Sequence, residues 1–178
     1  MLLVSLSLSF APYAHADIHN GTRSFYGVKY DSSAQTKTFR HNEKTYNYRD
    51  IYDTARFRWN NRSGINLTKN SHSWSDVYYV GTTSDSGLLG RVYPLNGSLD
   101  FVSMDSYWLF VKVYIYDNTM NNFKMSPNQR SSNATHEVGH TVKMKHPTSY
   151  TGSSVMRQGI QSIGPTSYDY SELKRKWN

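Results

Sequence analysis

The sequence predicts one domain in which helices and strands are mixed, an α+β or α/β fold. The length of 178 residues is that of a single domain. Hydrophobic residues at 37%, with aromatic residues at 15% of the chain, are enough to build a core. Segments of helical and of strand periodicity follow one another without an internal repeat. We therefore expect a single domain over residues 17–178, preceded by a leader.

The first sixteen residues have the features of a secretory signal peptide. An apolar run spaced by serines covers residues 1–10, and Ala14-His15-Ala16 matches an A-x-A cleavage site. No Lys or Arg precedes the apolar run, and a buried N-terminal strand is the alternative interpretation. Cleavage after Ala16 would leave residues 17–178, and the protein would be secreted and extracellular.

A helix is predicted over residues 48–59. Asn47 is a suitable N-cap, and Asp50 places a carboxylate in the first turn. The apolar residues of the segment recur at helical spacing and form one stripe: Tyr48, Ile51, Tyr52, Ala55 and Trp59. We expect this stripe to face the core.

Strands are predicted where short apolar or alternating runs occur between turn-forming residues. These runs cover residues 24–30, 65–67, 77–80, 88–93 and 109–116. The run at 109–116 is the longest and alternates most regularly. Together with the helix at 48–59, these strands predict a sheet with helices packed on it.

Composition excludes several classes of function. The chain has no cysteine, so any metal must be held by His, Asp or Glu. Twenty Lys and Arg against 13 Asp and Glu give a net charge of +7, but no block of five like charges exists, which favours a solvated basic surface over a nucleic-acid partner. No apolar run is long enough to span a membrane. We expect a monomer.

Residues 135–146 carry the strongest chemical signal. They contain the pattern H-E-x-x-H at His136, Glu137 and His140, with a third histidine at His146. On a helix, residues four apart lie on one face about 6 Å apart along the axis, so His136 and His140 can reach one metal ion. Glu137 would then lie beside the metal and could take a proton from water.

The alternative is that these histidines belong to an ordinary helix. With 7 His in 178 residues, the pattern with its third histidine would arise by chance with a probability of about 0.0002. Three His and a Glu on one face would also be costly to bury without a metal. Ser126 and Pro127 form a typical helix start, so the helix should already be formed at His136.

The segment resembles the motif of the metzincin zinc endopeptidases, H-E-x-x-H-x-x-G-x-x-H followed by a methionine turn. Within that family it is similar to the matrixin-like secreted branch of bacterial type. His136, Glu137, His140 and His146 match the motif, and Met156 is similar to the methionine of the turn.

The resemblance implies a twisted, mostly parallel five-stranded mixed sheet with an antiparallel strand at the cleft edge. It further implies a backing helix at 48–59, an active-site helix and a small C-terminal subdomain after His146. Met156 would form an apolar floor below the site. The edge strand around residues 88–92 would bind substrate as an added strand.

Lys143 departs from the motif, because the family has glycine at this position. Glycine permits the left-handed backbone that ends the helix and returns the third histidine to the metal. Lysine can adopt this conformation at a cost of about 1 kcal/mol, so Lys143→Gly should raise the melting temperature or leave it unaltered. The alternative is a helix that continues, with Glu172 or Asp169 completing a two-histidine site.

The resemblance implies a secreted zinc-dependent endopeptidase that acts on proteins or peptides. His136, His140 and His146 would hold Zn²⁺, and Glu137 would be the catalytic base. The alternative is a secreted basic surface-binding or toxin-like module with a structural metal site. Such a site would be closed by a fourth ligand and would not need Glu137.

Overall fold

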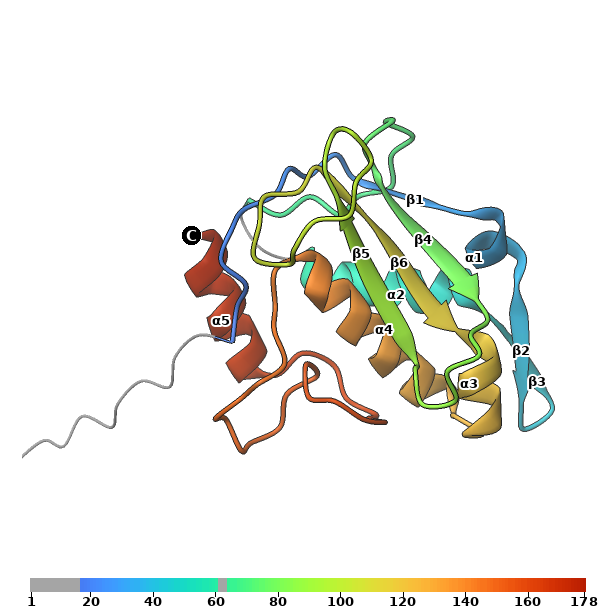
Figure 1. Cartoon of the computed structure of the whole chain (residues 1–178). Coiled ribbons are helices and arrows are strands. Elements are labelled where there is room, and N and C mark those ends of the chain that lie inside the picture. Colours follow the sequence, from blue (N-terminus) through green and yellow to red (C-terminus); the bar gives the residue numbers. More distant parts are fainter. Residues whose placement is uncertain (1–16, 61–63) are drawn as a thin grey trace, which may run out of the picture.

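The computed structural model describes residues 17–60 and 64–178 (Figure 1). The predicted signal peptide, residues 1–16, lies outside the described residues. The elements in chain order are β1 (Val28–Tyr30), α1 (Ser32–Thr36), β2 (Thr38–His41), β3 (Lys44–Asn47), α2 (Tyr48–Trp59), β4 (Asp76–Gly81), β5 (Gly90–Leu95), β6 (Phe110–Tyr116), α3 (Asp117–Asn122), α4 (Pro127–Thr141) and α5 (Ser167–Trp177). This mixture confirms the predicted α+β class. Among the described residues, no helix combines the length and the apolar character that a bilayer crossing requires.

The main sheet has four strands in the order β1-β4-β6-β5. The pairs β1–β4 and β4–β6 are parallel, whereas β5 pairs with β6 antiparallel and forms one edge. Val92 of β5 lies opposite Val113 of β6, and Val113 lies opposite Tyr78 of β4. The sheet is therefore mostly parallel with an antiparallel edge strand, as predicted. A separate antiparallel hairpin, β2–β3, was not predicted as a strand pair.

The expectation of five strands is wrong for the described sheet. The predicted strand at residues 65–67 contributes no ladder, and Lys69 makes only an isolated parallel bridge to Val28. Two side chains at the end of α2 form hydrogen bonds with the backbone of Leu67. The Asn60 side chain accepts from the Leu67 N–H at 2.6 Å, and the Arg56 side chain donates to the Leu67 carbonyl at 2.8 Å. Because these groups are already bonded, they are not free to form a sheet ladder.

Helices α2 and α4 cover the same face of the sheet and pack on each other (Figure 1). Helix α2 has the predicted bounds, and the Asn47 side chain caps it by accepting from the Asp50 N–H at 2.8 Å. All five stripe residues of α2 are buried. The Trp59 indole donates to the Thr135 carbonyl at 2.7 Å and so ties the end of α2 to α4.

A buried ion pair joins the sheet to the end of α4. The Arg23 guanidinium donates to both carboxylate oxygens of Asp76, at 2.7 and 2.9 Å, and both side chains are inaccessible to solvent. Arg23 also donates to the carbonyl of Thr141, the last residue of α4, at 2.9 Å. The Val111 N–H completes the set by donating to Asp76 at 3.0 Å. The C-terminal end of α4 is thereby held at a fixed place relative to the sheet.

Helix α5 packs beside the same end of α4. The Trp177 indole donates to the carbonyl of Val142, the C-cap of α4, at 2.9 Å. The side chain of Thr166 caps α5 in a capping box with Asp169. Between the end of α4 and α5, residues 142–166 form no helix and no extended strand. This irregular segment and α5 are the parts of the chain that surround the end of α4.

Candidate metal centre

Helix α4 carries two of the predicted site residues on adjacent turns. It begins as predicted: Ser126 and Gln129 form a reciprocal capping box, and Pro127 occupies the first turn. His136 and His140 are both partly buried, and their Nε2 atoms are 3.1 Å apart. The helical spacing therefore brings both imidazoles to one point, as the sequence pattern predicts.

The chain turns sharply after α4 and returns the third histidine to the same point. Lys143 has a φ of +72°, which confirms the predicted left-handed backbone. The N–H of Met144 bonds to the Gly139 carbonyl at 3.1 Å, which closes the last turn of the helix. His146 then lies with its Nε2 atom 3.0 Å from that of His136.

The two carboxylates considered as alternative ligands are bound elsewhere. Glu172 of α5 accepts from the Asp17 N–H at 3.0 Å and forms an ion pair with Arg175. Asp169 accepts from the Val155 N–H at 3.1 Å and supports the segment that holds Met156. Within the described residues, one group of three side chains could hold a metal ion, and its ligand atoms lie within 4.8 Å of one another: His136, His140 and His146.

Hydrogen bonds to carbonyl groups orient two of the imidazoles. Nδ1 of His136 is 2.9 Å from the Val155 carbonyl, and Nδ1 of His140 is 2.8 Å from the Met144 carbonyl. A carbonyl oxygen only accepts, so each Nδ1 carries the proton and each Nε2 presents a lone pair. Two lone pairs 3.1 Å apart repel each other, and a cation between them would turn this repulsion into attraction.

The three rings are neutral at physiological pH, as metal ligation requires. Burial, with a smaller contribution from the nearby His146 ring, lowers the pKa of His136 to about 4. Burial also lowers the pKa of His140 well below its ordinary value and lowers the pKa of His146. The donor set of three neutral imidazoles fits Zn²⁺, which favours nitrogen ligands at such sites.

Glu137 lies beside the three histidines and against the edge strand. Its side chain is buried, and burial raises its pKa to about 8, an effect that the Arg91 guanidinium opposes. Gly90 of β5 makes room for it, because a Cβ atom at Gly90 would lie 2.6 Å from the Glu137 carboxyl carbon. Among the described residues, no group forms a hydrogen bond with this carboxylate. Its oxygen atoms therefore remain available to a molecule in the cleft.

A cleft of about 630 Å³ opens over the histidines and Glu137. Residues 87–92 form one wall of the cleft, and α4 forms its floor. The opposite wall consists of Val155, Gln158, Gly159 and Gln161. Met156 is buried beneath α4, where Gly139 permits the close approach: a Cβ atom there would lie 2.4 Å from the Met156 sulfur. The methionine thus packs against the helix that carries the histidines.

No protein-family model and no curated protein sequence matches the chain. Among solved structures, its fold is similar to that of a chain in the GM1-bound form of the ECX AB5 holotoxin. The TM-score is 0.52 at 17% sequence identity, and the match covers 92% of this chain and 81% of that chain. At this identity, the similarity concerns the fold alone.

Sequence reasoning missed several residues that build the site. Gly90 is one, although a glycine inside the predicted strand at residues 88–93 gives a hint of close backbone approach. Asp105 is another: it pairs with Lys145 at 3.2 Å at the rim of the cleft. No pattern in the sequence could have indicated this pair, because the two residues are forty positions apart.

Proposed function

We propose that this protein is a secreted zinc-dependent endopeptidase of the metzincin type. One observation carries the proposal. Three neutral imidazoles converge on one point at the floor of an open cleft, and an unbonded carboxylate, Glu137, lies beside them. This arrangement has the three protein ligands and the adjacent base that metal-assisted hydrolysis requires.

His136, His140 and His146 would hold the ion through their Nε2 atoms. The chemistry that Zn²⁺ supplies at such a site is Lewis acidity toward water and toward the scissile carbonyl. Glu137 accepts a proton from the attacking water as its oxygen bonds to the carbonyl carbon. The same carboxyl group then donates that proton to the leaving nitrogen, so that an amide and water become a carboxylic acid and an amine.

The edge strand supplies a place for the substrate backbone. β5 pairs with β6 on one side only, and residues 87–92 border the cleft on the other. An extended peptide can add to such an edge through main-chain hydrogen bonds. This placement would bring a scissile bond over the histidines, and it would favour protein substrates over small amides.

The alternative function is a basic surface-binding or toxin-like module with a structural metal. The similarity in fold to a chain of a holotoxin structure is compatible with either function, because similarity of fold does not determine function. Within the described residues, no fourth His, Asp or Glu joins the three histidines. A structural site needs that fourth ligand, so this observation favours the enzyme.

Glu137→Gln tests the proposal. The variant should keep its fold and bind one zinc per chain, while hydrolysis of casein falls by roughly 10²- to 10⁴-fold. Metal analysis and a protease assay, each with and without a chelator, measure the two effects. Glu43→Gln, in the exposed β2–β3 turn, is the matched control and should behave as wild type.

Two results would contradict the proposal. Casein cleavage by Glu137→Gln at the wild-type rate would remove the catalytic assignment. Zinc bound by the wild type without hydrolysis of casein or of a denatured protein mixture would favour the structural-metal module instead.

A further inference from the structure

Lys143 occupies a position where its side chain is unexpected. Its backbone is left-handed, a conformation that glycine adopts with least strain. Its side chain is nevertheless buried completely, whereas lysine ammonium groups ordinarily remain in water. Burying a cationic side chain at a strained backbone position requires strong compensating contacts.

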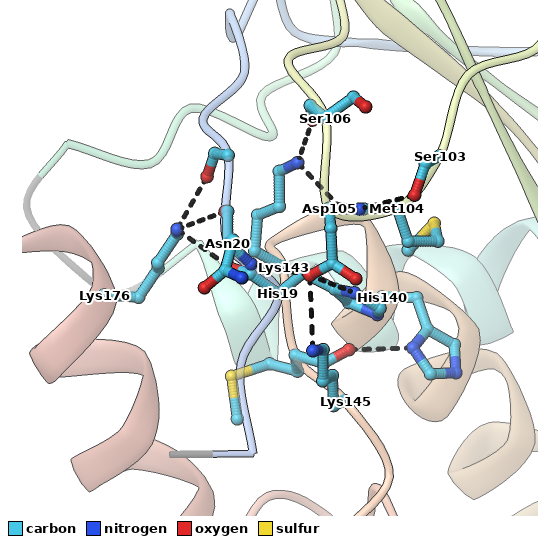
Figure 2. Close-up of polar contacts among 12 residues, drawn as sticks. His19, Asn20, Ser103, Met104, Asp105, Ser106, His140, Lys143, Lys145 and Lys176 are labelled. Carbon is cyan, nitrogen blue, oxygen red and sulfur yellow. Dashed lines mark hydrogen bonds and ion pairs between the residues drawn. The ribbon is translucent and has the colours of Figure 1, made fainter. Parts of the chain in front are cut away.

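These contacts all come from one loop, residues 103–108. The Lys143 ammonium donates to the carbonyl of Ser106 at 2.6 Å and to that of Met104 at 3.0 Å. It also lies 3.2 Å from the centre of the buried Trp108 ring. Figure 2 shows the side chain crossing from the turn after α4 to this loop.

Burial, with smaller contributions from the charges of Lys176 and Arg23, lowers the pKa of Lys143 to about 7. The two carbonyl acceptors and the indole face act in the opposite direction, because they stabilise the ammonium. A neutral amine still has two N–H groups, which suffice for the two carbonyls. The hydrogen bonds therefore do not depend on the protonation state of Lys143.

The loop and the turn are also joined at the rim of the cleft. Asp105 pairs with Lys145 at 3.2 Å and accepts from the Asn20 N–H at 2.8 Å (Figure 2). Met104 and Lys145 both line the cleft, beside His146. Two sets of contacts, those of Lys143 and the Asp105–Lys145 pair, therefore join the turn before His146 to the loop at the cleft wall.

We propose that Lys143 is a positioning residue, whose side chain fastens the 103–108 loop to the left-handed turn and so fixes both His146 and the Met104 wall. The inference rests on the proposed function for the role of His146. Glycine would allow the left-handed turn but could not hold it, whereas the buried Lys143 side chain binds the turn to the 103–108 loop. Among the described residues, no carbonyl accepts from His146 as Val155 and Met144 accept from the other two histidines, so its placement depends most on the turn.

Lys143→Met and Lys143→Gly test the proposal together. Methionine keeps most of the volume and removes the N–H groups, whereas glycine also relieves the left-handed backbone. Lys69→Met is the matched control, because the Lys69 ammonium likewise binds an oxygen atom, of Asp53 at 2.8 Å, and lies over an aromatic ring, that of Tyr30, but none of these residues lines the cleft. Lys143→Arg tests rescue by a side chain that retains charge and donors.

Three measurements are made on each protein: the zinc dissociation constant by chelator competition, the absorption spectrum of the Co²⁺ form, and the melting temperature of the metal-free protein. Both Lys143 variants should bind zinc 10- to 100-fold more weakly than wild type and show an altered Co²⁺ spectrum. Lys69→Met should change neither metal property. Lys143→Arg should recover part of the affinity.

The outcomes separate this inference from the proposed function. Wild-type zinc affinity in Lys143→Gly would overturn the inference, because backbone conformation alone would then place His146. Unfolding of both Lys143 variants while Lys69→Met folds would also overturn it, because the role would be one of overall stability. Absence of zinc binding by the wild type would instead refute the proposed function.

Discussion

Gly90→Ala should displace the Glu137 carboxylate and leave the three histidines in place. A Cβ atom at Gly90 would lie 2.6 Å from Glu137, and ordinary contact begins near 3.4 Å, so the carboxyl group must retreat by about 0.8 Å (3.4 − 2.6). A displacement of about 1 Å at a reacting group can cost roughly 100-fold in rate. We therefore expect kcat to fall by roughly two orders of magnitude.

Stability and metal content should change little in this variant. Gly90 lies in an ordinary strand conformation, which alanine also adopts without backbone strain. The three atoms nearest to the new methyl group all belong to the flexible Glu137 side chain, which must move, and none of them belongs to a histidine. The melting temperature should therefore change little, with one zinc per chain.

The assay is hydrolysis of a fluorogenic peptide library, with kcat and KM measured separately, and a metal analysis of the same samples. Gly87→Ala is the control on the same segment, since the nearest atom to its new Cβ would be 3.8 Å away. Equal kcat values for Gly90→Ala, Gly87→Ala and wild type would refute the placement of Glu137 against the edge strand.

Two further predictions concern buried and exposed charges. Asp76→Asn should destabilise the fold by about 3 to 5 kcal/mol, because Arg23 is left as a buried charge without its partner; a loss below about 1 kcal/mol in urea unfolding, typical of an exposed pair, would contradict this. Hydrogen bonding from the Asn20 N–H, with the nearby Lys145 and His19, lowers the pKa of Asp105 to about 2. Because this lies below the value of an unfolded aspartate, Asp105 stabilises the fold above about pH 4 and loses that effect as the pH falls toward 2. The difference in melting temperature between wild type and Asp105→Asn should therefore be present at neutral pH and vanish in acid, and a pH-independent difference would rule out the ionic contribution.

The helices of the site follow from local patterns and were predictable. The apolar stripe gave the bounds of α2, and Ser126 with Pro127 gave the start of α4. These features depend on residues that lie within about one turn of each other, which is the range that sequence patterns describe. The left-handed backbone at Lys143 was expected only from the resemblance to a motif that has glycine at this position, and the structure confirms it.

Features that depend on distant residues could not be predicted. The Lys143 side chain is the clearest case: from the sequence, Lys143→Gly should not lower the melting temperature. The structure reverses this expectation, because glycine relieves about 1 kcal/mol of backbone strain but removes two hydrogen bonds of roughly 1 kcal/mol each and a ring contact. The missing fifth strand has a similar origin, since Asn60 and Arg56 engage Leu67 through packing that no pattern records.

The packing of α5 against the end of α4 has a practical consequence for anyone who handles this protein. Trp177 donates to the carbonyl that follows α4, and Lys176 donates to the carbonyls of residues 19–21. Substituting these two residues, or attaching a bulky group beside them, would therefore perturb the turn that carries His146. The β2–β3 turn projects on the side of the molecule away from α5 (Figure 1), and it is the better place to attach a label or a surface tether.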